Sequence, residues 1–132
     1  MLKDLVLKNR SYRRFDGKTA VSQEMMEQLV DLARICPSSR NQQALKFMTV
    51  NSPHQGNLIF PCLAWAGYLK DWDGPVAAER PSAYIIILGD TRIGSKFETD
   101  LGICAQTILL GAVEMDLGGC IIGSIKRDAL RT

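Results

Sequence analysis

One stretch near the C-terminus constrains the fold most, because it is apolar almost all round at helical spacing. Residues 98–117 place the following apolar side chains on one helical face: Leu101, Cys104, Ala105, Ile108, Leu109, Ala112 and Met115. Ile103, Leu110 and Val113 fall on other sides of the same helix. A surface helix would keep those sides polar, so the pattern predicts a long helix at the centre of the core.

Shorter patterns predict further helices and strands. Apolar spacing indicates a short helix over 2–8 and a longer one after Ser22, a good N-cap, which Pro37 stops. Residues 46–50 are typical of a strand. The continuous β-branched run at 83–88 is typical of a strand buried on both faces.

The segment between the strands and the C-terminal end carry weaker signals. Residues 58–68 are mostly apolar and fit either a helix or an irregular wall, and 70–75 form a polar, turn-rich segment. Gly118-Gly119 is expected to end the long helix, and 120–122 fit a short strand or an extended segment. A last helix is expected after Ser124, with only about two turns before the chain ends.

Length and charge limit the class of protein. The chain has 132 residues with no repeat and no linker, which predicts one domain. Sixteen Lys and Arg against fourteen Asp and Glu leave a net charge of +2, too small to favour a nucleic-acid binder. No apolar run reaches the roughly 18 residues of a membrane helix, and early charges leave no room for a signal peptide. We expect a cytoplasmic protein with no membrane or nucleic-acid partner.

Histidine and cysteine are too few and too scattered to predict a metal site. Cys36, Cys62, Cys104 and Cys120 never form C-x-x-C, and His54 is the only histidine. We expect the cysteines to be buried, reduced packing residues and His54 to be solvated in a turn beside Pro53. No catalytic triad or phosphate-loop motif is present.

Three polar or glycine-rich stretches are candidates for a binding site. Residues 9–14 place guanidinium groups and a hydroxyl together, which can bind a phosphate or simply form an exposed basic turn. Residues 37–42 offer donors and acceptors that could read the edge of a heteroaromatic ring, or merely end a helix. Residues 118–124 contain glycines that would let a planar ligand approach the backbone, or they form a packed strand between turns.

In order and spacing, these stretches resemble the FMN-dependent nitroreductase family. The matching residues are Arg10-Ser11-x-Arg13 with Phe15, Ala33-Arg34-x-x-Pro37-Ser38-Ser39-x-Asn41-x-Gln43, Ala105-Gln106, and Leu117-Gly118-Gly119 followed by Gly123. The resemblance runs over nearly the whole chain. It implies an α+β fold, in which helices flank a central, mostly antiparallel sheet and two flavins lie at a homodimer interface.

The resemblance assigns the basic stretch to FMN. Arg10 and Ser11 match positions that hold the FMN phosphate, and Arg13 matches a basic position near the phosphate, the ribityl chain or the pyrimidine edge. A nearby arginine would stabilise the negative charge of a reduced flavin. The flavin itself carries the chemistry, so no catalytic side chain is expected.

The resemblance assigns the other two stretches to the flavin ring. The segment whose backbone lies against the isoalloxazine matches Ile122 and Gly123. The loop that reaches the flavin, typically from the partner chain, matches Pro37, Ser38, Ser39 and Asn41.

The sequence also departs from the family. Ala44-Leu45 stand where the family often has Pro-Trp, Asn9 stands where many members have another basic residue, and residues 54–80 show no clear counterpart to flavin-contacting residues. The family normally continues with another strand, further basic phosphate contacts and an arm around the partner. The resemblance therefore implies that 1–132 is a single nitroreductase-like domain without that C-terminal strand and arm.

These features leave three interpretations of function. The first is an oxidoreductase that uses FMN, takes a hydride from NAD(P)H and reduces a nitroaromatic, a quinone or a similar small aromatic acceptor in a ping-pong cycle. The second is a flavin-binding protein, or an incomplete fragment, without turnover. The third is a basic turn that docks on nucleic acid or an acidic protein, which the near-neutral charge disfavours.

Overall fold

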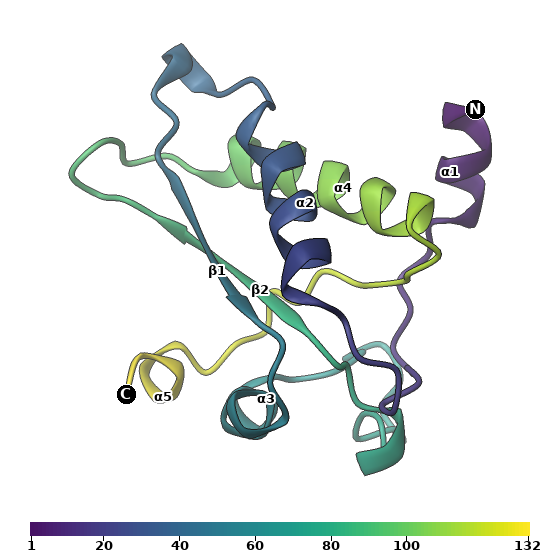
Figure 1. Ribbon diagram of the computed structural model, residues 1–132. Coiled ribbons are helices and arrows are strands. Elements are labelled where there is room, and N and C mark those ends of the chain that lie inside the picture. Colours follow the sequence, from purple (N-terminus) through teal and green to yellow (C-terminus); the bar gives the residue numbers. More distant parts are fainter.

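Two helices pack on one face of a two-stranded antiparallel sheet in the computed structural model, which describes residues 1–132 (Figure 1). The helices and strands are α1 (Leu2–Lys8), α2 (Gln23–Arg34), β1 (Leu45–Val50), α3 (Pro53–Ile59), β2 (Tyr84–Gly89), α4 (Glu98–Glu114) and α5 (Arg127–Arg131). The 3₁₀ turns are η1 (Ser39–Asn41), η2 (Phe60–Cys62) and η3 (Ala77–Glu79). α4 contacts α2 along its length and α1 near its C-terminal end.

The long apolar helix is the centre of the core, as its pattern predicts. The buried residues of α4 are Asp100, Cys104, Ala105, Ile108, Gly111 and Ala112. The core cluster joins three of these to Leu29 and Ala33 of α2, and side chains of both strands pack against it. Burying one aliphatic side chain of this kind is worth about 1.5–3 kcal/mol, so the α2–α4 contact is a main source of stability. No helix in the structure is both long and apolar enough to cross a membrane.

α2 begins and ends where local signals predict. The Ser22 hydroxyl accepts the backbone N–H of Met25 at 3.1 Å, which caps the helix. Met26, Leu29 and Ala33 form the buried face. The helix ends at Arg34, before Pro37.

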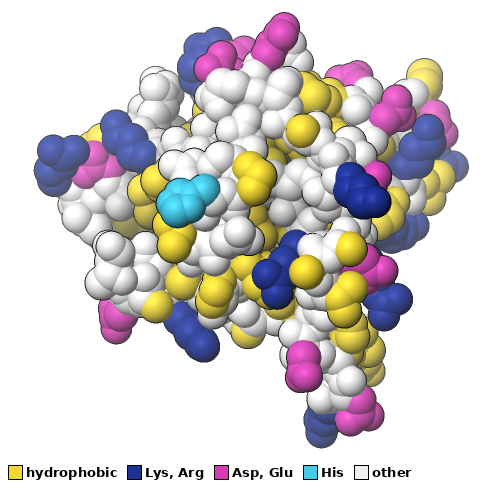
Figure 2. Space-filling model, turned by 60° about the horizontal axis from the view of Figure 1, so that its bottom comes forward, with side chains coloured by type: hydrophobic (Ala, Val, Ile, Leu, Met, Phe, Trp, Pro, Cys, Tyr) yellow, Lys and Arg dark blue, Asp and Glu magenta, His cyan; other side chains and the backbone are white.

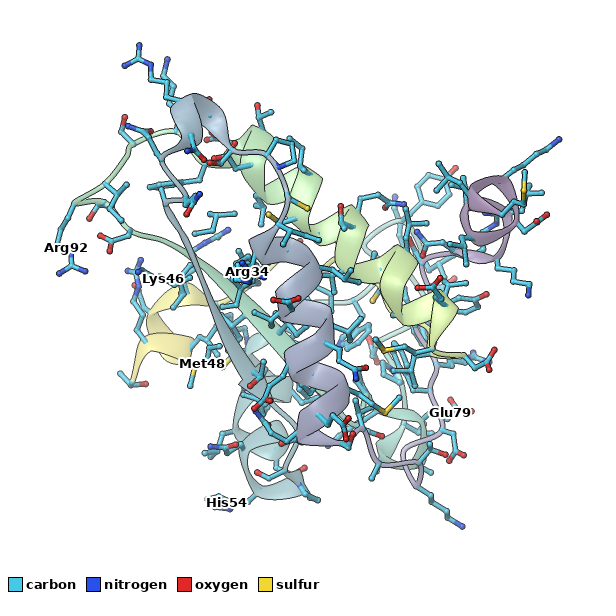
Figure 3. The ribbon with its side chains drawn as sticks, turned by 45° about the horizontal axis from the view of Figure 1, so that its top comes forward. Arg34, Lys46, Met48, His54, Glu79 and Arg92 are labelled. Atoms are coloured by element: carbon cyan, nitrogen blue, oxygen red, sulfur yellow. The ribbon has the colours of Figure 1, made fainter.

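The core helices cover one face of the sheet, and the other face is covered only in part, which corrects the prediction that residues 83–88 form a strand buried on both faces. Phe47 pairs with Ile87 in the antiparallel register, and both pack against the helical core. The opposite face carries Met48 and Leu88, which are 50% and 49% exposed. Met48 projects away from α2 in Figure 3. On this opposite face Val50 is buried, and Tyr84 and Ile86 are half-buried, so β2 is open to solvent mainly at its Leu88 end.

The segment after β1 contains a helix that the sequence patterns did not predict. Ser52 caps α3 by accepting the N–H of Gln55 at 3.3 Å, and Pro53 occupies the first turn. His54 therefore lies in a helix and not in a turn, although it is exposed, as expected (Figures 2 and 3). From residue 63 to 76 the chain is irregular. Of the range 58–68, residues 58–62 are therefore helical and residues 63–68 form an irregular wall, so each of the two interpretations holds for part of it.

The end of α4 and the C-terminal run also differ from expectation. α4 ends at Glu114, three residues before 117, because Asp116 adopts a left-handed conformation at φ 57°. Residues 120–122, for which a short strand or an extended segment is expected, form no strand, and the run from 120 to 124 lies between the bridges at Gly119 and Ile125. Ser124 does not cap the last helix; α5 begins at Arg127 with Lys126 as its N-cap.

The four cysteines are free, but only two are fully buried. Cys62 and Cys104 are buried, whereas Cys36 and Cys120 are half-buried. Burial raises the pKa of the Cys104 thiol to about 11, and the neighbouring Cys36 adds to this shift. Cys104 is therefore a neutral thiol at physiological pH and packs as a small apolar residue.

Substitutions of two glycines test the conformation of the irregular segment, residues 63–76. Gly74 has φ +110°, and a Cβ there would lie 2.8 Å from Cδ1 of the buried Trp65. We expect Gly74→Ala to lower the free energy of unfolding by about 1–3 kcal/mol, through both strain and overlap. A Cβ on Gly67 would meet no atom within 4 Å, so Gly67→Ala is the matched control and should change stability by less than about 0.5 kcal/mol. Urea unfolding of both variants measures this, and equal effects would contradict the conformation.

Candidate functional site

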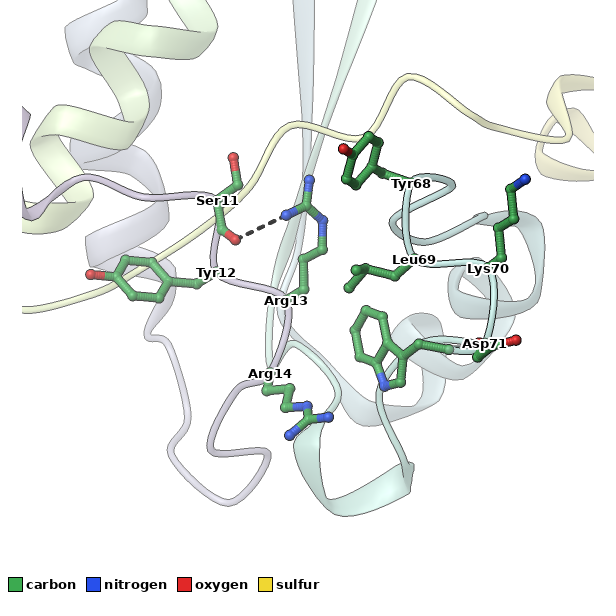
Figure 4. Close-up of a pocket in the computed structure, with 9 residues that line it drawn as sticks. Ser11, Tyr12, Arg13, Arg14, Tyr68, Leu69, Lys70 and Asp71 are labelled. Carbon is green, nitrogen blue, oxygen red and sulfur yellow. Dashed lines mark hydrogen bonds between the residues drawn. The ribbon is translucent and has the colours of Figure 1, made fainter.

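An open groove of about 840 Å³ lies between the N-terminal segment and the loop that follows η2 (Figure 4). Its lining residues are Ser11, Tyr12, Arg13, Arg14, Tyr68, Leu69, Lys70, Asp71 and Trp72. The volume is in the range of about 300–1,000 Å³ that is usual for small-molecule and cofactor sites. One wall belongs to the basic stretch that the sequence singles out, and the other to the irregular segment.

The N-terminal wall is joined to the glycine-rich stretch through the backbone. Ser11 forms an isolated parallel bridge with Gly119, and the Tyr12 N–H donates to the Gly119 carbonyl at 3.1 Å. The ring of Tyr12 lies so close to Gly118 that a Cβ there would be 2.7 Å from its Cδ2. Two of the three predicted stretches are therefore adjacent, and the close approach depends on a glycine at 118.

The C-terminal run connects the two walls of the groove. It is held at one end by the Ser11–Gly119 bridge and at the other by a bridge between Leu63 and Ile125. Between these points, Ile122 is half-buried and Gly123 is exposed. A Cβ on Gly123 would meet no atom within 4 Å, so open space lies beside this backbone.

Arg13 and Arg14 line the groove in different ways. Arg13 is half-buried and rises between Ser11 and Tyr68, where one guanidinium nitrogen donates to the Ser11 carbonyl at 3.2 Å (Figure 4). The Arg14 guanidinium carbon lies 5.5 Å from the centre of the Trp72 ring. Such a cation–π contact is worth about 0.5–1 kcal/mol at an exposed site, and it ties the two walls together.

Arg10 points away from the groove. Its guanidinium donates to the Val6 carbonyl at 3.2 Å and to the Asn9 carbonyl at 2.8 Å, at the C-terminal end of α1. Arg10 would reach a ligand in the groove only after releasing these bonds. The sequence-predicted role of Arg10 stays a prediction, whereas Ser11 and Arg13 lie in the groove wall.

The groove is electropositive. Three cations and one carboxylate are among its lining side chains: Arg13, Arg14, Lys70 and Asp71. The positive field of Arg13 also reaches Cys120 on the C-terminal run. Burial raises the pKa of the Cys120 thiol, and the Arg13 charge opposes that rise. An anionic ligand therefore suits this groove better than a cationic one.

The serine-rich loop lies at the other end of α4. The Ser39 N–H donates to a carboxylate oxygen of Asp100, in the first turn of α4, at 3.0 Å. The Ser11–Gly119 bridge follows the last turn of the same helix. The 17 residues of α4 span about 25 Å at 1.5 Å per residue, so one chain does not bring Pro37, Ser38, Ser39 and Asn41 to its own groove. Figure 1 shows η1 and the C-terminal end of α4 well apart.

The sequence patterns identified none of the residues of the second groove wall, Tyr68–Trp72, as part of a site. Tyr68 and Trp72 lie in an irregular loop, which has no periodicity to mark it. The available signal is the pair of aromatic residues, Tyr68 and Trp72, on either side of Leu69, Lys70 and Asp71, and such a segment resembles an ordinary polar turn. Nowhere do three His, Cys, Asp or Glu side chains come close enough to hold a metal ion.

A family model decides the wider assignment. The nitroreductase family model matches residues 6–132. The chain belongs to this family. No curated protein matches it at a significant level.

Solved structures of nitroreductases share the fold. A nitroreductase family protein from Clostridium novyi NT superposes with a TM-score of 0.79 at 20% identity, covering 99% of this chain and 74% of that one. An FMN-dependent nitroreductase from Clostridium difficile R20291 gives 0.76 at 21% identity, covering 96% and 74%. A candidate NADH dehydrogenase/NAD(P)H nitroreductase from Bacteroides thetaiotaomicron VPI-5482 gives 0.70 at 23% identity, covering 89% of this chain and 64% of that chain. The predicted α+β, nitroreductase-like fold is confirmed.

The contrast between Arg13 and Arg10 can be tested without a ligand. We expect Arg13→Met to raise the apparent pKa of Cys120, because the substitution removes the positive charge that favours the thiolate. Alkylation of Cys120 at pH 8 should slow by about three- to tenfold. Arg10→Met should leave the rate unchanged, because Arg10 faces α1. Mass spectrometry of alkylated peptides over a pH series measures the Cys120 alkylation rate in both variants. A Cys120 pKa that is unchanged in Arg13→Met would contradict the placement of Arg13 beside Cys120.

Proposed function

We propose that this groove binds FMN and that the chain is an FMN-dependent oxidoreductase that oxidises NAD(P)H and reduces a nitroaromatic, a quinone or a similar aromatic acceptor. The observation that carries the proposal is the composition of the groove. It combines guanidinium groups, a hydroxyl and aromatic rings. The membership of the nitroreductase family, and the similarity to an FMN-dependent relative, support it.

The polar part of the groove fits a phosphate. Ser11 provides a hydroxyl and Arg13 a guanidinium from the same wall, and Lys70 belongs to the other wall. Charge-assisted hydrogen bonds from such groups hold phosphates in many proteins. Arg10, beside this wall, is a further phosphate contact if its bonds to α1 open.

The apolar part of the groove fits a flat ring system. Tyr68, Leu69 and Trp72 supply aromatic and aliphatic surface. Ile122 and Gly123 do not line the groove, but open space lies beside the Gly123 backbone. A planar ligand in the groove would contact this run only by extending toward Gly123. When bound, FMN would supply the two-electron redox chemistry.

The residues of the chain act on charge and position. Arg13 places a positive charge where a reduced, negatively charged ring would be stabilised.

We also propose that the complete site involves two copies of the chain. The serine-rich loop and the groove are separated by the length of α4 within one chain. A homodimer that placed the loop of one copy over the groove of the other would bring Ser38, Ser39 and Asn41 to the same ligand as Arg13. This is the arrangement that the sequence resemblance implies.

FMN titration tests the groove. We expect Arg13→Ala to weaken FMN binding by about 10- to 100-fold, because it removes a charge-assisted contact in the electropositive wall. Lys18→Ala is the matched control, since Lys18 belongs to the same basic segment but does not line the groove. Quenching of FMN fluorescence measures both affinities. Equal affinities for the two variants would contradict the assignment of the groove.

Turnover separates an enzyme from a flavin carrier. The same FMN-loaded protein is mixed with NADH or NADPH under anaerobic conditions, and a quinone is then added. Bleaching of the flavin absorbance followed by its recovery is the expected result. Stable yellow colour in the presence of both nucleotides would favour the flavin-binding protein without turnover.

A further inference from the structure

Asp100 is the only charged residue buried in the structure, and it has one evident partner. It is 5% exposed and lies in the first turn of α4, where the helix dipole favours an anion. Its Oδ1 accepts the backbone N–H of Ser39 at 3.0 Å, across 61 positions of sequence. A buried carboxylate is costly unless it is hydrogen-bonded, so this contact calls for a functional reason.

The loop that Asp100 holds has an unusual backbone. Arg40, Asn41 and Gln43 have φ of +53°, +53° and +51°, although none is glycine. Left-handed conformations at such residues persist only where the surroundings impose them, and they gather at binding and active sites. A tight loop of this kind points its side chains in directions that a relaxed loop would not.

Most of the bonds that shape this loop lie inside it. The Gln43 N–H donates to the Ser38 hydroxyl at 3.0 Å, and the Gln43 side chain donates to Asn41 Oδ1 at 3.0 Å. The bond from Ser39 to Asp100 is the one side-chain hydrogen bond that ties the loop to another element. Asp100 therefore anchors the loop to the first turn of α4.

We propose that Asp100 is a positioning residue that fixes the serine-rich loop for ligand binding. Its buried carboxylate anchors the Ser39 backbone and so holds Ser38, Ser39 and the left-handed Asn41 in the loop conformation that the structure shows. The part of this inference that concerns the flavin rests on the proposed function. The part that concerns the loop rests only on the contacts above.

Two substitutions of Asp100 distinguish its role as a hydrogen-bond acceptor from its role in packing. Asp100→Asn keeps an oxygen acceptor for the Ser39 N–H, whereas Asp100→Leu has a similar size and no acceptor. Asp31→Asn, on the exposed side of α2, is the control for the loss of one negative charge. Limited trypsin cleavage after Arg40, scored by mass spectrometry, reports on the loop without any ligand, and FMN titration reports on binding.

A second variant removes the donor and guards against misfolding at 100. Ser39→Pro deletes the Ser39 N–H, and the extended backbone of Ser38 at φ −134° and ψ 155° tolerates a following proline. If the Ser39–Asp100 hydrogen bond holds the loop, Asp100→Leu and Ser39→Pro should each raise the rate of cleavage after Arg40. The double variant should then be cleaved little faster than either single variant.

The loop assay has a clear expected pattern. We expect cleavage after Arg40 to be about tenfold faster in Asp100→Leu and in Ser39→Pro than in the unaltered chain. Asp100→Asn should stay within about threefold, because its oxygen rescues the bond, and Asp31→Asn should not differ. Unchanged cleavage in both Asp100→Leu and Ser39→Pro would overturn the anchoring role. If Asp100→Leu does not fold, the Ser39→Pro result decides.

The flavin assay distinguishes the two levels of the inference. FMN binding that weakens about tenfold in Asp100→Leu and is rescued in Asp100→Asn would support the whole proposal. Cleavage that follows the acceptor while FMN affinity does not change would overturn the role in ligand binding. If even the unaltered chain binds no FMN, the proposed function fails, while the cleavage pattern still decides whether Asp100 anchors the loop.

Discussion

The burial of α4 is the interaction on which the rest of the structure depends. Its apolar surface packs on α2 and on one face of the sheet, and this contact provides the hydrophobic core of the domain. The two ends of the helix also contact the two parts of the proposed site. The first turn binds the serine-rich loop through Asp100, and the chain beyond the last turn pairs with Ser11. A rigid core helix thus sets the separation of the two halves of the proposed site.

The groove shows how an irregular chain can build a site. The N-terminal segment adds to no sheet and joins the glycine-rich run through only a few backbone bonds. Opposite it, the loop from Tyr68 to Trp72 is supported by the buried Trp65 and by the left-handed Gly74. The arginine–tryptophan contact closes the pair of walls.

Local patterns predicted some elements correctly and could not predict others. α2 and α4 were found because capping and apolar spacing are local and strong, and two candidate stretches were found because glycine and arginine mark them. The sequence patterns do not predict the start of α3, because a turn is expected at Pro53 and His54, although serine before proline is also a helix start. The burial of β2 was overestimated, since the sequence of a strand does not state how many layers cover its sheet.

The candidate site was predictable only in part, for similar reasons. Which arginine of the basic stretch faces the groove depends on how Ser11 pairs with Gly119, a contact between residues far apart in sequence. The wall at 68–72 depends on the path of an irregular loop. The role of Asp100 is visible only once its long-range bond to Ser39 is known. Spacing along the chain contains none of these three facts.

The central claim is that one ligand, FMN, occupies the groove between the N-terminal segment and the 68–72 loop. The most direct test is a two-dimensional ¹H–¹⁵N NMR titration of the labelled chain with FMN, which follows every backbone amide at once. We expect the largest chemical-shift changes at the backbone amides of Ser11–Arg14, 68–72 and 119–123. Shifts confined to other regions, or no shifts at millimolar FMN, would contradict it.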